Sequence, residues 1–331
     1  MLRPQEYLDV IRKEYLQDFI RHGGAAVKFI VPTEEIDHIE LKQQLCGVSE
    51  SEGYLFATID AAKTGVHMID HIFHDVARQV EWDDLAFSFV SRLLSNNGYT
   101  VPSHQEFNIR KLSELNQLDE TLLPVEIQKL LIKYLFHDYQ MCQEFRIAMM
   151  RLCLSQIDPS DAYPVPSDVI KAWLRGELSR VSEIKPAHIF QKITRHNARH
   201  MLSSLSHWLH LTGKSGLIIT LDISRCLVQR PKSKDLADDS RYYSMAAILD
   251  VYEVLRQFID TTDDMEFCFI VIIATPPFLH PDERRGIYIY DALKMRILDE
   301  VCDKYRTNPF SSLIRLSPCP NVSVEPQKDI A

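Results

Sequence analysis

Two strongly apolar runs most limit the folds open to this chain. They are Gly216 to Ile223 (GLIITLDI), in which only Thr220 and Asp222 are polar, and Phe267 to Ala274 (FCFIVIIA). A strand with one face in water alternates apolar and polar residues, whereas these runs do not alternate. Continuous runs of this length are typical of parallel strands that helices cover on both faces. Two shorter runs, Ala25 to Val31 and Tyr54 to Ile59, predict two further strands. We therefore expect an α/β fold with a parallel sheet.

Apolar residues at three- and four-residue spacing predict helices between and around these strands. We expect helices at 5–22, from the polar segment 32–40 to Cys46-Gly47, at 65–96, over most of 100–190, at 186–211 and at 243–259. A long helical block thus interrupts the strands. We divide the chain into a first part of the core (1–98), a helical insertion (99–185), a second part of the core (186–316) and a disordered polar tail (317–331).

Composition excludes several classes of protein. The chain has 37 basic and 46 acidic residues, a net charge of −9, which disfavours bulk binding to the nucleic-acid backbone. Its seven cysteines form no C-x-x-C pair, so neither a disulfide framework nor a cysteine-rich zinc site is expected, and a cytoplasmic location fits best. No apolar run reaches the length of a membrane-spanning helix, and the N-terminus has no secretory signal pattern.

Asp222 lies at the end of the expected strand Gly216 to Ile223. A Walker B aspartate occupies the same position at the end of its strand and holds Mg²⁺ on the phosphates. The next residue is Ile223, which cannot polarise an attacking water as a glutamate would. The alternative interpretation is an aspartate that caps the following loop. The nearby Gly213-Lys214-Ser215 is not a phosphate loop, because Trp208 stands where the first glycine should be and a strand follows instead of a helix.

Histidines recur at helical spacing in two places, His67, His71 and His74, and His196, His200 and His207. Two histidines at i and i+4 can chelate a metal ion, but the H-E-x-x-H pattern is absent. We expect polar helix faces here and no metal site. No G-x-S-x-G motif indicates a serine hydrolase.

Several sequence blocks occur together in one order between residues 10 and 316. They are Trp173 to Glu177 (WLRGE), Asn197-Ala198-Arg199, Gly216 to Asp222, Tyr252 to Asp260, Ala274-Thr275-Pro276, Gly286, Tyr290, Ala292-Leu293, Arg296 and Arg315-Leu316. This set resembles the ATP-binding proteins of BREX phage-defence systems, the BrxC/BrxD family. The resemblance implies a three-layer P-loop NTPase core of the AAA+ type with a parallel sheet and a large helical insertion, in a protein that works beside a helicase or modification enzyme. It also implies a sensor position at Thr275 and a basic residue near an interface at Arg296.

The chain departs from this family where the phosphate-binding loop should follow the first strand. The family has a glycine-rich loop ending in G-K-[ST], whereas this chain continues Pro32-Thr33-Glu34-Glu35-Ile36-Asp37-His38. Without glycine or lysine, and with three acidic residues, such a loop would repel triphosphate. We therefore predict a degenerate member with no catalytic residues, in which Asp222 and Thr275 are remnants of the nucleotide site and no cofactor is needed.

The predicted function is that of a pseudo-ATPase that scaffolds or regulates a partner helicase or active ATPase of the same defence system. One alternative is an active ATPase that uses ATP and Mg²⁺, and a third is a DNA-binding adaptor. We also consider contacts with further copies of the chain, and we expect DNA to be reached only through partners and no membrane association.

Overall fold

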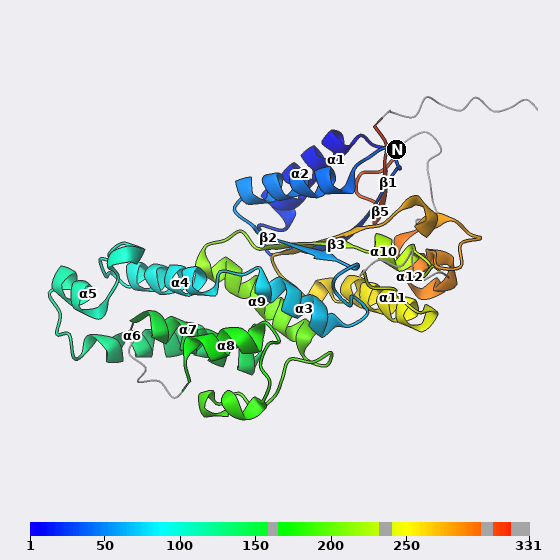
Figure 1. Cartoon of the computed structure of the whole chain (residues 1–331). Coiled ribbons are helices and arrows are strands. Elements are labelled where there is room, and N and C mark those ends of the chain that lie inside the picture. Colours follow the sequence, from blue (N-terminus) through cyan, green and yellow to red (C-terminus); the bar gives the residue numbers. More distant parts are fainter. Residues whose placement is uncertain (158–164, 232–239, 299–306, 319–331) are drawn as a thin grey trace, which may run out of the picture. The chain divides into compact units, whose positions relative to one another are not determined.

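A computed structural model describes residues 1–157, 165–231, 240–298 and 307–318 (Figure 1). The chain divides into two compact units. The core unit comprises Met1–Met68, Ile218–Asp264 and Cys268–Ala331, and the helical unit comprises Ile69–Leu217 with Met265–Phe267. The predicted insertion, 99–185, lies inside the helical unit, which also includes the helices immediately before and after that range. Most of the predicted tail, from 319 on, lies outside the described residues.

The core unit is built on one five-stranded parallel sheet in the order β2-β3-β4-β1-β5. The strands are β1 (Ala25–Pro32), β2 (Leu55–Asp60), β3 (Leu217–Asp222), β4 (Cys268–Ile273) and β5 (Leu313–Leu316). The α/β prediction and its four strands are confirmed. The sequence does not predict β5, because a run of four residues that includes the charged Arg315 carries too little pattern to indicate a strand.

Strand β1 lies between β4 and β5 and fixes the register of this half of the sheet. Ala25 pairs with Cys268, and Phe29 pairs with Leu313. The outer edge of β5 is covered in turn by the N-terminus. The Leu2 amide donates to the Arg315 carbonyl at 3.1 Å, and the Ser317 amide donates to the Leu2 carbonyl at 3.0 Å. This pairing satisfies backbone groups that an open sheet edge would leave exposed.

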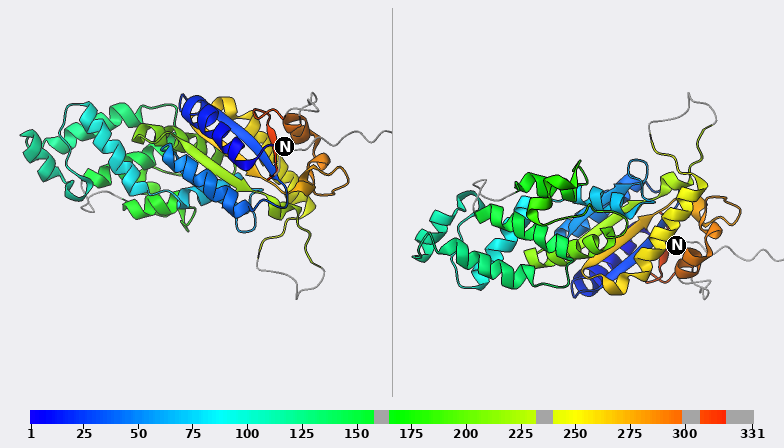
Figure 2. Two further views of the ribbon diagram at one scale, coloured as in Figure 1. Left: turned by 90° about the horizontal axis from the view of Figure 1, so that it is seen from above. Right: turned by 90° about the horizontal axis from the view of Figure 1, so that it is seen from below.

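Helices cover the two faces of the sheet, as the continuous apolar runs require. Helix α1 (Pro4–Val10), the π-helix η1 (Ile11–Phe19) and α2 (His38–Ser51) lie on one face, and α11 (Met245–Asp260) lies on the other (Figures 1 and 2). Successive strand residues serve opposite faces. On β1, Ile30 joins the cluster that contains Leu41 of α2, whereas Phe29 stacks on Phe278 with ring centroids 6.2 Å apart.

Short elements complete the core unit after the strands. They are α10 (Ser224–Leu227), η7 (Thr262–Asp264), η8 (Pro276–Leu279), η9 (Ile287–Ile289) and α12 (Asp291–Ile297). Most of the polar segment 229–241 (QRPKSKDLADDSR) lies outside the described residues. Among the described helices, none is both long enough and apolar enough to cross a lipid bilayer.

The helical unit packs around a buried aromatic centre. Trp82 stacks on Trp208 at 6.2 Å between ring centroids, and Phe145 meets Trp208 edge-on at 6.3 Å. These rings come from helices far apart in the sequence. The elements are α3 (Ile69–Arg78), α4 (Trp82–Asn96), η2 (His104–Glu106), α5 (Ile109–Asn116), α6 (Leu123–Leu131), η3 (Ile132–Phe136), α7 (Gln143–Ile157), α8 (Ser167–Leu174), η4 (Val181–Glu183), η5 (Lys185–Ala187) and α9 (Ala198–Thr212).

The helix predicted at 186–211 is wrong in its first part, since α9 begins only at Ala198. Pro186 lies in the 3₁₀ turn η5, and His188 after it has φ = +65°. A left-handed residue ends any right-handed helix at that point, and apolar spacing alone does not reveal it.

Gly216 allows the turn into β3 and offers a test of this backbone geometry. Its φ is +144°, and an added Cβ would lie 2.2 Å from the Phe267 carbonyl oxygen. We expect Gly216→Ala to lower the free energy of unfolding by more than about 1 kcal/mol, because the substitution adds both backbone strain and a clash. The measurement is the urea midpoint of the whole chain.

Gly47→Ala is the matched control. Gly47 lies in α2, and no atom lies within 4 Å of the position that its Cβ would take. Alanine there should raise stability by about 0.5–1 kcal/mol. Equal midpoints for Gly216→Ala and the wild type would contradict the strained geometry.

Candidate functional site

The candidate site is the edge of the core sheet where the parallel strands end. In open α/β sheets, ligands bind outside the carboxyl ends of the strands. Strand β1 ends here at Pro32, and the loop 33–37 leads from it into α2. A strand, a loop and a helix N-terminus in this order form the phosphate-binding part of a P-loop NTPase. The loop 33–37 therefore stands where a phosphate loop would be.

Several backbone donors of this loop are already used within the chain. The Thr33 amide donates to the Leu316 carbonyl at 2.9 Å, and the Ile36 amide donates to the Thr33 carbonyl at 3.0 Å. The Asp37 carboxylate caps α2 by accepting from the Ile39 amide at 2.8 Å. Glu34 and Glu35 are exposed. A side-chain carboxylate thus occupies the helix N-terminus at which a phosphate would otherwise be held.

One buried side-chain atom of this loop lacks a hydrogen-bond partner among the described residues. The Thr33 hydroxyl is buried, and within the described ranges no hydrogen-bonding group reaches it. A buried hydroxyl of this kind indicates a place for a water molecule or a ligand atom.

Asp222, at the end of β3, is buried and fully engaged. Its Oδ2 lies 3.0 Å from Lys42 Nζ and 3.7 Å from His38 Nδ1, and its Oδ1 accepts from the Ser224 amide at 3.0 Å. Burial disfavours the charged carboxylate, but interactions with His38 and Ser224 and the charge of Lys42 outweigh it. Together they hold the pKa of Asp222 well below its usual range. A magnesium ion at Asp222 would have to displace the lysine.

Lys42 and His38 are not predicted as site residues from the sequence, although both lower the pKa of Asp222. They lie four residues apart on α2, so they share one face of that helix. The spacing i, i+4 was the available signal. Their pairing with Asp222, which lies 180 residues after Lys42, depends on the order of the strands in the sheet.

Thr275 follows β4, the strand between β1 and β3. Its backbone is extended, and its carbonyl accepts from the Phe278 amide at 3.0 Å as η8 begins. Its side chain caps nothing and is partly exposed. Thr275 and Asp222 thus end neighbouring strands, which is where the resemblance places a sensor residue, and the sensor role stays a prediction.

Arg296 lies on α12 and is engaged within the core unit. It donates to both oxygens of Asp260 on α11, at 2.5 and 3.0 Å, and to the Ala292 carbonyl at 2.7 Å. Arg256 contacts the same Asp260 carboxylate and also Glu253. Hydrogen bonds from Arg256 above all, together with Tyr290 and Gln257, lower the pKa of Glu253 to about 2 despite some desolvation. This network joins α12 to α11. The role of Arg296 at an interface with another protein stays a prediction.

Two of the spaced histidines, His74 and His207, have separate partners within the helical unit. The His74 Nδ1 lies 3.0 Å from the Leu174 carbonyl. His207 lies between two carboxylates, 2.9 Å from Asp138 and 3.3 Å from Glu266. In the described parts of the chain, no three or more His, Cys, Asp or Glu side chains are grouped to hold a metal ion.

The Lys42–Asp222 pair predicts an acid-sensitive stability. Because the folded pKa of Asp222 is lowered, its contribution is present above the unfolded pKa of about 4 and is lost as the pH falls below that value. We expect Asp222→Asn to lose about 2–4 kcal/mol at pH 7, since it leaves Lys42 without its partner. In urea titrations, the difference in the free energy of unfolding between the variant and the wild type should narrow progressively as the pH falls below about 4.

Asp263→Asn is the control for that experiment, since Asp263 is exposed and forms no ion pair among the described residues. It should follow the wild-type curve at every pH. A loss as large as that of Asp222→Asn would show that the effect is one of net charge and not of this pair.

His207 predicts the opposite dependence. Burial lowers its pKa, but hydrogen bonds and charges from Asp138 and Glu266 outweigh burial and raise it. The stabilisation is therefore complete below the unfolded pKa of about 6.5 and is lost as the pH rises through the folded value. We expect the wild type to lose this stabilisation above about pH 6.5 and Asp138→Asn to lose much less, with melting curves from pH 5.5 to 9 as the measurement. Parallel curves for the two proteins would rule out the ion pair as the cause.

Comparison with known proteins bears on the second half of the chain. A family model described as "BREX system ATP-binding protein BrxC/D" matches residues 159–324, half of the sequence. The match includes Asp222, Thr275 and Arg296, whereas β1 and the loop 33–37 lie before it. Neither the curated proteins nor the solved structures include a significant match. With half of its length matched and a sheet consistent with a P-loop NTPase core, the chain belongs to the BREX system ATP-binding protein BrxC/D family.

Proposed function

We propose that this family member is a pseudo-ATPase, a non-catalytic subunit that scaffolds or regulates a helicase or an active ATPase of a BREX-like antiphage system. The observation that carries the proposal is the Lys42–Asp222 ion pair at the end of β3. In an active P-loop enzyme a lysine at the start of this helix contacts the phosphates, and the strand-end aspartate serves Mg²⁺. Here the lysine and the aspartate of the site neutralise each other.

Three further features support the absence of catalysis. Pro32 has no amide hydrogen, and the amides of Thr33, Ile36 and Ile39 have acceptors within the chain. Glu34, Glu35 and Asp37 place negative charge where triphosphate would approach. Ile223 follows Asp222 where a water-polarising glutamate would be needed. On this proposal the protein requires neither ATP nor Mg²⁺.

One observation favours the alternative, an active or ATP-binding enzyme. The buried Thr33 hydroxyl lacks a hydrogen-bond partner among the described residues, and it lies in the loop that would face a nucleotide. If ATP binds, Thr33 and a released Asp222 are the residues expected to contact it and its Mg²⁺. The third candidate, a DNA-binding adaptor, has no such support, and the net charge of −9 opposes it.

The proposed setting follows from the family and the composition. We place the protein in the cytoplasm, with a helicase or active ATPase of its defence system as partner and with further copies of itself as a second kind of contact. DNA is reached through those partners and not by this chain alone.

Thermal unfolding with and without millimolar Mg-ATP tests the proposal. A ligand at 100 times its dissociation constant adds about 2.7 kcal/mol, which raises the melting temperature of a chain of this size by several degrees. We expect no shift in the wild type and none in Asp222→Asn. A shift in the wild type that disappears in Asp222→Asn would overturn the pseudo-ATPase proposal and favour the enzyme.

A further inference from the structure

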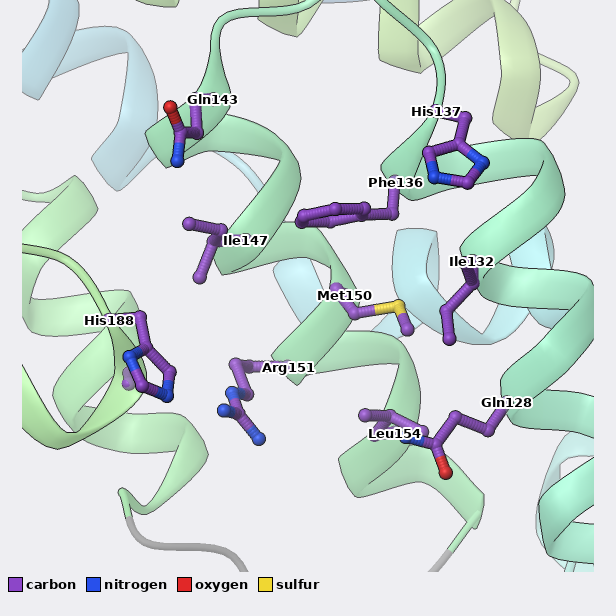
Figure 3. Close-up of a pocket in the computed structure, with 11 residues that line it drawn as sticks. Gln128, Ile132, Phe136, His137, Gln143, Ile147, Met150, Arg151, Leu154 and His188 are labelled. Atoms are coloured by element: carbon purple, nitrogen blue, oxygen red, sulfur yellow. The ribbon is translucent and has the colours of Figure 1, made fainter.

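The helical unit contains a cavity of about 420 Å³ that the candidate site does not use (Figure 3). Its volume falls within the range of small-molecule sites, about 300–1,000 Å³. The wall is mainly apolar and is formed by η3, α7 and the end of η5. The apolar lining residues are Ile132, Phe136, Ile147, Met150, Leu154 and Ala187.

A π-helical turn shapes one wall of this cavity. In η3 the His137 amide donates to the Ile132 carbonyl at 3.1 Å, which is the i to i+5 bond of a π-helix. Ile132 and Phe136 stand at the two ends of this wide turn and both line the cavity. The buried Arg146 holds the turn by donating to the Phe136 carbonyl. Such π turns are rare in proteins overall, and those that occur often lie at functional sites.

Three polar side chains line the cavity beside its apolar wall. Gln128, Gln143 and Arg151 line the cavity, and none of the three makes a side-chain hydrogen bond to any residue that the structure describes. Arg151 is half-buried, and over the described ranges no carboxylate pairs with it. Figure 3 shows Arg151 projecting from α7 and His188 from the turn after η5. His188 is held there in a left-handed conformation, φ = +65°.

A guanidinium with no carboxylate partner among the described residues, beside an apolar cavity, fits a ligand with two chemical parts. The apolar wall would bury a hydrocarbon or aromatic body. The guanidinium can form a bidentate, charge-assisted contact with an anionic group. The two glutamines can donate to the same group or accept from a neighbouring hydroxyl or amide.

We propose that this cavity binds a small organic anion, an apolar body that carries one carboxylate, sulfonate or phosphate group, with Arg151 as the residue that recognises the anion. The site is separate from the sheet edge of the core unit, and it does not depend on whether the protein binds ATP. Binding here would give the helical unit a ligand of its own.

Fluorescence titration with anilinonaphthalene sulfonate tests the proposal, since this dye has an aromatic body and one anionic group. We expect Arg151→Gln to weaken binding of the dye about tenfold and Arg151→Lys to weaken it less, because lysine keeps the charge. The uncharged analogue phenylnaphthylamine should bind the wild type and both variants equally. Met150→Trp, which fills the cavity, should weaken binding of both dyes.

Arg195→Gln is the matched control. Arg195 is exposed in the same unit and has no ion-pair partner in the described residues, so its loss removes the same charge from elsewhere. Circular dichroism checks that each variant folds, and Ile147→Phe replaces Met150→Trp if the latter does not. Wild-type affinity for the sulfonate dye in Arg151→Gln, or an equal loss in Arg195→Gln, overturns the role of Arg151. Wild-type affinity for both dyes in the filled variant overturns the site itself.

Discussion

The ion pair between Lys42 and Asp222 is the interaction on which the sheet edge depends. Asp222 ends a strand with every residue buried, and a buried carboxylate without a partner is costly by several kcal/mol. Lys42 supplies the opposite charge from the second turn of α2, and the Ser224 amide satisfies the other oxygen. The pair therefore ties α2 to β3, two strands away from the β1 strand that leads into that helix. A cation that is required for this tie is not free to meet a phosphate.

The loop before α2 follows the same electrostatic logic. A helix N-terminus attracts an anion through its free amides and its dipole, and in a P-loop that anion is the nucleotide. Here Asp37 provides the anion from within the chain, and Glu34 and Glu35 add further negative charge nearby. At this sheet edge the N-terminus of α2 and the Asp222 carboxylate thus have partners within the chain, whereas the Thr33 hydroxyl has none among the described residues.

The sequence predicts the elements that a local apolar pattern determines. It predicts few of the features that depend on contacts between residues far apart in the chain. Strands β1 to β4 follow from apolar runs, and the place of Asp222 follows from the end of one run. Strand β5 is too short to carry a pattern, and Lys42 becomes part of the site only through a strand order that spacing does not encode. The π turn of η3 cannot be predicted from the sequence for another reason. One extra residue in a turn barely alters the apolar spacing of a helix.

The basic residues of this chain divide by whether they have an internal partner. Lys42 and Arg296 are bound to carboxylates of their own unit, and each holds a helix in place. The charge of each is already neutralised by a carboxylate of the chain before any ligand arrives. Arg151 differs, since no carboxylate of the described chain neutralises it and an apolar cavity lies beside it. A half-buried charge persists beside an apolar wall at a free-energy cost, which an anion bound in the cavity would remove.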